Sequence, residues 1–188
     1  MTKLEIYNLA LAQHAKRCTA DEMTAVSKPH EVDACDQMFD IAVENVLGEF
    51  DWSFCVAPIE LETDDDMPYG EWSHGYLLPY GLIRIARVEN GTYPFMVGRG
   101  RFYCNEEDPK LWGIRMDAKC IEYGPHDFCA LVGLWLAYLI SPILSPSDTN
   151  LANRILQSYS AQLQTLMKRE LNSVNDNYLE ADDWGRKL

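Results

Sequence analysis

The hydrophobic and polar positions repeat with two different periods, and the change of period divides the chain into segments. Apolar residues recur every three or four positions over residues 3–17 and again over residues 28–50, which is the spacing of amphipathic helices. Ser27 is a candidate N-cap for the second helix, and Pro29 suits its first turn. The pattern therefore predicts two helices in the N-terminal part, the second of them long.

After Asp51 the period shortens to about two, which is typical of half-buried β-strands. The strand-like runs are separated by glycine, proline and asparagine, which favour turns. They lie at residues 52–61, 75–79, 82–88, 93–98, 101–105, 111–116 and 119–123. The Asn-Gly pair at 90–91 suits a type I′ turn that would pair the third and fourth runs as a hairpin, and residues 98–100 suit a second turn. The sequence therefore predicts an antiparallel sheet region.

The run LIRIARV at residues 82–88 places two arginines among aliphatic side chains. Strict alternation would put Arg84 on one face of the strand and Arg87 on the other. A sheet with one face in water would instead place both arginines outward. The run is therefore interpreted either as a strand with both faces partly covered or as part of a surface that contacts a partner.

The C-terminal third returns to helical patterning. Residues 128–144 are nearly uncharged, and Pro142 interrupts them before the length of about 20 residues that a membrane span needs. They predict a helix that is apolar on all sides and buried in the core of a soluble protein. Residues 149–174 predict a last amphipathic helix, and the segment after them has no periodicity.

The fold class predicted is α+β. The N- and C-terminal segments, residues 1–51 and 124–174, are expected to form a helical bundle. Residues 52–123 are expected to form an inserted antiparallel β-sheet region, and residues 175–188 a C-terminal tail.

The charge balance narrows the classes of partner. The 188 residues contain 29 acids and 16 lysines and arginines, with a formal net charge of −13. This excess argues against general binding to nucleic acid or to anionic membranes, which requires clustered cations. Nearly half of the cations lie between Arg84 and Lys119, whereas residues 60–66 form an acidic run. These segments are either complementary surfaces between copies or solvated faces.

The six cysteines show neither a CxxC pair nor the spacing of a zinc site. The first 18 residues have an amphipathic pattern and lack the continuous apolar core of a signal peptide. We therefore expect a reducing compartment, in which the cysteines act as small buried apolar residues.

Candidate catalytic residues are few. His126, Asp127 and Cys129 could form a metal site or a Cys/His pair, but they also suit the start of a helix after Pro125, where an acid is favourable. The chain contains none of the common nucleotide-binding, serine-hydrolase or zinc-protease motifs. We expect a protein that is not an enzyme and has no cofactor. The alternatives are a small cytosolic enzyme or metal-binding protein with this site, and an acidic module that mimics nucleic acid.

Several segments, in matching order and spacing, resemble the tail tubular protein A family of short-tailed bacteriophages, the head-to-tail adaptors. The similarity covers roughly residues 5 to 170. Its segments are ALAQHAK (10–16), NVLGEFDWSF (45–54), YLLPYGLIRIARV (76–88), YPFMVGRGRFYCN (93–105) and PHDFCALVGLWLAYLISPIL (125–144).

The resemblance implies a structural virion protein at the head-tail junction, present in the host cytoplasm during assembly, with no membrane contact. Family members form a twelve-fold ring of neighbouring copies beneath the portal protein. They extend the channel through which DNA passes without specific binding, and they receive the tail nozzle protein and, in some phages, tail fibres. On this basis two sets of residues are candidate contacts. Those for portal docking are Tyr178, Trp184, Arg186 and Leu188, and those for contact between subunits are Arg84, Arg87, Arg99 and Arg101.

Overall fold

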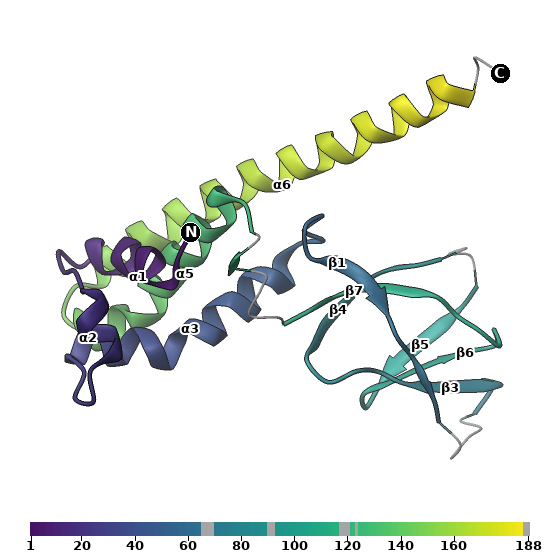
Figure 1. The fold of residues 1–188 in the computed structure, drawn as a ribbon, viewed down its shortest axis with the longest axis horizontal. Coiled ribbons are helices and arrows are strands. Elements are labelled where there is room, and N and C mark those ends of the chain that lie inside the picture. The colour runs from purple at the N-terminus through teal and green to yellow at the C-terminus, as the bar shows by residue number, and fades with distance from the viewer. Residues whose placement is uncertain (65–69, 90–92, 117–120, 123, 186–188) are drawn as a thin grey trace. The chain divides into compact units, whose positions relative to one another are not determined.

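The structure, a computed structural model of the chain, describes residues 1–64, 70–89, 93–116, 121–122 and 124–185, with side chains described as far as residue 172. Helices occupy both ends of the chain and antiparallel strands its middle, so the predicted α+β class is confirmed (Figure 1). The chain divides into two compact units. We call Met1–Val46 with Ile121–Leu188 the helical unit, and Leu47–Cys120 the strand unit.

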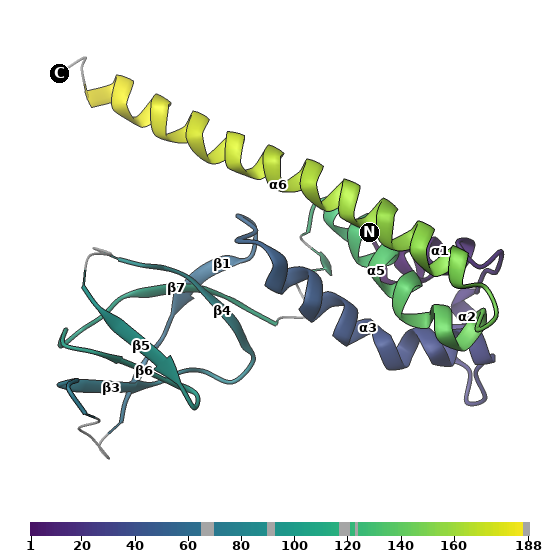
Figure 2. The same cartoon turned by 180° about the vertical axis from the view of Figure 1, so that it is seen from behind.

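The helical unit is built around one apolar helix. Its elements are α1 (Lys3–Ala12), α2 (Ala20–Thr24), most of α3 (His30–Glu49), α5 (His126–Leu144) and α6 (Thr149–Gly185). Helix α5 packs against α1 and against α6 (Figure 2). The structure shows this pairwise packing and not the predicted helical bundle.

Helix α5 contributes much of the core of the helical unit, including Phe128, Leu136 and Ile140. By length and composition α5 could also cross a membrane, and half of its most apolar window is buried inside the structure. Gly133 allows α1 to approach closely, because a Cβ atom there would lie 3.2 Å from the Cβ of Leu9. Burial on both the α1 and α6 sides explains why α5 has no polar face.

In the N-terminal part of the chain the helices differ from the sequence prediction in three places. Helix α1 ends at Ala12 rather than at residue 17, and Ala15 has a positive φ of 55°. Helix α2 was not predicted, although Thr19 and Glu22 form a complete capping box at its start. Helix α3 begins at His30, so Ser27 is not its N-cap.

Helix α6 runs to Gly185 and not only to residue 174. The segment predicted as a C-terminal tail, residues 175–188, is therefore helical as far as Gly185, while residues 186–188 lie outside the described part of the chain. The sequence from 174 to 184 contains no proline or glycine, so nothing in it stops a helix once the preceding turns have formed.

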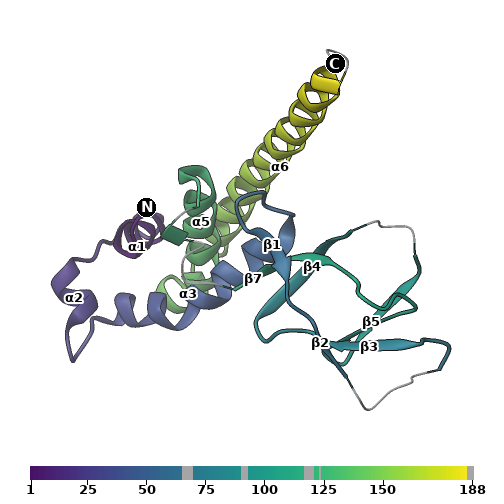
Figure 3. The ribbon, with the colours of Figure 1, turned by 45° about the vertical axis from the view of Figure 1, so that its right-hand side comes forward.

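The strand unit contains two antiparallel sheets (Figure 3). The first has the order β1-β7-β4, formed by Val56–Ile59, Leu111–Arg115 and Leu82–Val88. The second has the order β2-β3-β6-β5, formed by Glu62–Thr63, His74–Leu77, Arg101–Cys104 and Phe95–Gly98. Side chains from both sheets form one core cluster, which consists of Ile59, Tyr76, Phe102, Cys104 and Leu111.

The predicted hairpin between residues 82–88 and 93–98 is wrong. Strand β4 pairs with β7 and β5 pairs with β6, so β4 and β5 belong to different sheets. The predicted Asn-Gly turn at 90–91 lies outside the described residues. The second predicted turn is confirmed: Arg99 and Gly100 join β5 to β6 with φ of 52° and 73°, as a type I′ turn requires.

The last predicted strand, residues 119–123, is also wrong where the structure describes it. Ile121 and Glu122 are helical, and the remaining residues of that segment lie outside the described part. Ile121 is buried in the helical unit. A run of five residues is too short for its periodicity to distinguish a strand from a helical turn.

Candidate contact surface on the strand unit

Strand β4 carries two of the candidate arginines, and its pairing with β7 is interrupted twice. The register shifts between Leu82 and Arg84 and again between Ile85 and Arg87. Each extra residue in a strand reverses the facing of the side chains that follow it. Two such irregularities within seven residues replace simple alternation by a repeat of three.

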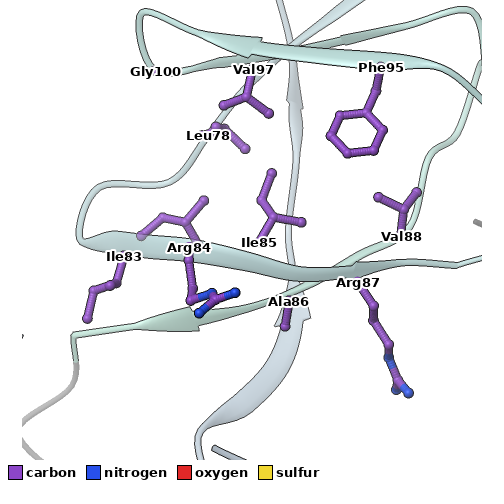
Figure 4. A pocket seen from close by; sticks show the side chains of 11 residues that line it. Leu78, Ile83, Arg84, Ile85, Ala86, Arg87, Val88, Phe95, Val97 and Gly100 are labelled. Atoms are coloured by element: carbon purple, nitrogen blue, oxygen red, sulfur yellow. The ribbon is translucent and has the colours of Figure 1, made fainter. Parts of the chain in front are cut away.

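As a result β4 has one apolar face and one face with arginines. Figure 4 shows Ile85 and Val88 pointing toward β5, whereas Arg84 and Arg87 both point to the opposite side. The prediction of one arginine on each face is therefore wrong, because it assumed an uninterrupted pleat. The two arginines instead share a face, as expected for a strand with one covered side.

The apolar face of β4 and the strand β5 border an open groove of about 780 Å³. Phe95 and Val97 of β5 lie across the groove from Ile85 and Val88 (Figure 4). Both β5 side chains are close to half exposed, at 46% and 49%. Phe95 also stacks on Phe102 of the core, with ring centroids 5.2 Å apart. The groove is thus an apolar surface continuous with the core and open to solvent.

Arg84 has partners within its own unit. Its Nε lies 3.1 Å from Oδ1 of Asp51, and its Nη1 donates a hydrogen bond of 3.2 Å to the carbonyl of Gly48. Gly48 belongs to the last turn of α3, where carbonyls lack helical partners and a cation is favourable. Arg84 therefore fastens β4 to the end of α3.

Arg87 is exposed and lies over the ring of Trp112 on β7, with the guanidinium carbon 4.3 Å from the ring centroid. Within the described residues Arg87 forms no ion pair. Stacking on an aromatic ring orients the guanidinium plane and leaves its edge N–H groups able to donate to a carboxylate. Arg87 is thus a fixed, outward-facing cation.

The remaining two candidate arginines lie at the β5–β6 hairpin. Arg99 is exposed in the turn. Arg101 forms an ion pair with Asp64. Asp64 is the last residue of the predicted acidic run, residues 60–66, that the structure describes. The basic and acidic segments therefore meet within one chain at this pair.

The candidate portal-docking residues are Tyr178, Trp184, Arg186 and Leu188. The side chains of the first two and the whole of the last two lie outside the described part of the chain. Only the helical backbone of α6 as far as Gly185 is described there.

The three residues of the alternative site at the start of α5 have different surroundings and different partners. His126 is exposed at the first helical position, and Asp127 forms an ion pair with Arg169 of α6. Cys129 is fully buried, and its thiol donates to the carbonyl of Ile121 at 3.6 Å. Burial raises the pKa of the Cys129 thiol, which makes it a poor nucleophile. No group of three or more potential metal ligands occurs among the described residues.

Four of the five described cysteines are buried, as predicted, namely Cys18, Cys35, Cys104 and Cys129, whereas Cys55 is partly exposed. Burial raises the pKa of Cys35 to about 12. These thiols therefore act as apolar core residues at neutral pH.

A polar cluster around Asp36 in the helical unit was missed by the sequence analysis. Asp36 accepts hydrogen bonds from the Tyr7 hydroxyl at 2.7 Å and from Lys28 at 2.5 Å, and Lys3 lies 3.4 Å away. Burial alone would raise the pKa of Asp36, but the hydrogen bonds from Lys28 and Tyr7 outweigh it and lower that pKa. No local pattern signals a contact made across 29 residues of sequence.

No family model matches the chain, and no curated protein matches its sequence.

Proposed function

We propose that this protein is a structural component of a short-tailed bacteriophage virion, a head-to-tail adaptor that forms a ring between the portal protein and the tail nozzle. The observation that carries the proposal is the length of α6 relative to the helix it packs against. Tail fibres, where the virion has them, would attach to the same ring.

Helix α6 has 37 residues and α5 has 19, so at 1.5 Å per residue they are about 55 Å and about 28 Å long. The two helices are antiparallel, and the ion pair between Asp127 and Arg169 links the first turn of α5 to the middle of α6. Leu171, beyond this pair, is 53% exposed. The rest of α6 therefore extends past α5 within the helical unit (Figure 2).

An isolated helical segment is only marginally stable in water. The part of α6 that extends past α5 carries Tyr178, Leu179 and Trp184, and tyrosine and tryptophan are the residue types most enriched at energetically important interface positions. A partner that covers the end of α6 would stabilise it. In the proposed adaptor that partner is the portal protein.

The charges of the chain agree with a ring around a DNA channel. A net charge of −13 per copy repels phosphates, so that the duplex slides through rather than adsorbing. Arg84 and Arg101 already contact carboxylates of their own chain. Arg87 and Arg99, both exposed, are the better candidates for contact with a neighbouring copy.

The proposal is tested by measuring the mass of the purified chain, alone and mixed with the portal protein of the same genome. We expect the portal particle to gain about twelve copies, consistent with a closed symmetric ring. Deleting residues 176–188 should abolish the gain, whereas Lys168→Gln, at an exposed α6 position outside the deletion, should not. Absence of association at every ratio would refute the adaptor role.

A further inference from the structure

The two sheets of the strand unit meet at one corner and are open at the other. Strands β1 and β2 are separated only by Glu60 and Leu61, so the chain passes from the first sheet directly into the second. From this corner the first sheet runs through β7 to β4, and the second runs through β3 and β6 to β5. The strands thus form an incomplete barrel around the core, and its open seam is the groove between β4 and β5 (Figure 4).

Both borders of the seam are unpaired strand edges. Strand β4 ends one sheet and β5 ends the other, and within the described residues no strand pairs with the outer edge of either. Exposed edges are normally protected by charged residues, by proline or by a covering element. Residues 95–98, FMVG, contain no charge or proline, and Phe95, Met96 and Val97 are each 38–49% exposed.

We propose that the seam binds an extended segment of a partner protein, six to eight residues in which apolar and acidic side chains alternate. Such a segment would add a strand to β4 or β5 through backbone hydrogen bonds, the mode called β-strand addition. Its apolar side chains would enter the groove beside Ile85 and Phe95. Its acidic side chains would lie on the outer face of the barrel, where Arg87 stands exposed.

The chemistry of the occupant follows from three features of the seam. The unpaired edges can form backbone hydrogen bonds with an extended segment, in which every second side chain points to the same face. The apolar groove favours apolar side chains on that face, and the guanidinium of Arg87 favours carboxylates at the positions between them. The length matches β4, whose seven residues span about 23 Å at 3.3 Å per residue.

The closed corner of the barrel already contains a segment of this type. At residues 59–62 Ile59 is buried and Leu61 half-buried, whereas Glu60 and Glu62 are exposed. The barrel therefore accepts an alternating apolar and acidic strand at one corner, and the seam offers the same environment at the other. This inference does not depend on the adaptor role.

The test uses the full chain and a fluorescent eight-residue peptide that alternates valine with glutamate. We expect saturable binding by fluorescence anisotropy, and at least about tenfold weaker binding of two control peptides. One control replaces glutamate by lysine, and the other keeps the side chains but carries N-methyl groups that remove backbone donors. An N-methylated peptide that binds equally well would overturn the proposal, because strand addition requires those donors.

Variants of the chain locate the site. Val97→Lys, at an exposed position in the groove, should abolish peptide binding while leaving the circular dichroism spectrum unchanged. Arg87→Gln should weaken binding of the glutamate peptide about fivefold, and Lys110→Gln, which removes the same charge elsewhere in the strand unit, should not. No binding to the folded wild-type chain, or binding unaffected by Val97→Lys, would refute the proposal. If the chain formed a dimer that Val97→Lys disrupts, and the peptide did not displace the second copy, the seam would instead be an interface between two copies.

Discussion

Arg87 of β4 stacks on Trp112 of the adjacent strand β7, with the guanidinium carbon 4.3 Å from the ring centroid. The stack exists because the second register shift in β4 turns Arg87 to the outer face, and the pairing sets it directly opposite Trp112. An exposed cation thereby acquires a fixed direction, although no carboxylate in the described part of the chain pairs with it.

The first prediction concerns the free energy of unfolding that this stack contributes. Arg87→Gln should lower it by about 0.5–1 kcal/mol, the usual size for a cation–π contact at an exposed site. A double-mutant cycle with Trp112→Leu, measured by urea unfolding, should give a coupling energy of that size. Arg99→Gln in the exposed turn is the matched control and should leave stability unchanged. A coupling energy of zero would show that the contact is incidental.

Local patterns predicted the elements better than their pairing. The spacing of apolar residues located α3, β4, β5 and β6 to within about two residues, because burial on one face imposes the period. The two irregularities of β4 could not be predicted, since LIRIARV alternates as well as any regular strand. They arise from the fit against β7, a strand more than 20 residues away in the sequence, and they decide which face the arginines occupy.

The candidate site was predicted only in part, because it too depends on how strands that are distant in the sequence pair. Arg84 and Arg87 were identified from their place among aliphatic residues, but the groove beside them results from β4 and β5 joining different sheets. An Asn-Gly pair between two strands favours a hairpin locally. Pairing of β4 with β7 and of β5 with β6 overrides that preference, because it buries Phe102 and Leu111 in one core.

The second prediction is a pH dependence of stability from the Tyr7–Asp36 pair. The pKa of Asp36 is lowered in the folded chain, so its contribution to stability is present above the ordinary carboxyl value of about 4 and is lost as the pH falls. The pKa of Tyr7 is raised, first by burial and then by its hydrogen bond to Asp36, so its contribution is present below about 10 and is lost as the pH rises.

The measurement is the urea midpoint of unfolding between pH 3 and pH 11. Asp36→Asn should flatten the acid limb of the profile, and Tyr7→Phe should flatten part of the alkaline limb. Gln37→Glu, which adds a titrating carboxyl next in sequence to Asp36, should not flatten the acid limb. An acid limb unchanged by Asp36→Asn would show that the hydrogen bonds from Tyr7 and Lys28 do not hold this carboxylate.

The third prediction concerns the accessibility of the thiols. Among the described cysteines Cys55 is the one that is partly exposed, whereas Cys35 is fully buried with its pKa raised to about 12. An alkylating reagent at pH 8 should therefore modify Cys55 well before Cys35, because only an accessible thiolate reacts. Peptide mapping after timed quenching measures both rates. Equal rates in the native chain, with both residues reaching full modification together, would contradict the buried position of Cys35.

The fourth prediction concerns Gly113 of β7, which faces the irregular part of β4. A Cβ atom at this position would lie 2.6 Å from the carbonyl oxygen of Arg84 and 2.5 Å from Cδ1 of Ile59. The backbone of β4 approaches that closely because the strand is irregular there, so alanine could not be accommodated without moving backbone. Gly113→Ala should lower the free energy of unfolding by about 1–3 kcal/mol.

Gly48→Ala, in the last turn of α3, provides the contrast. Its added Cβ would make an ordinary contact of 3.5 Å with Ile83 of β4. Alanine is favoured over glycine inside a helix by about 1 kcal/mol, so this variant should be neutral or slightly stabilising. Urea unfolding of the two variants compares them directly. If Gly113→Ala were as stable as Gly48→Ala, β4 would have to pair regularly with β7, and Arg84 and Arg87 would return to opposite faces of the strand.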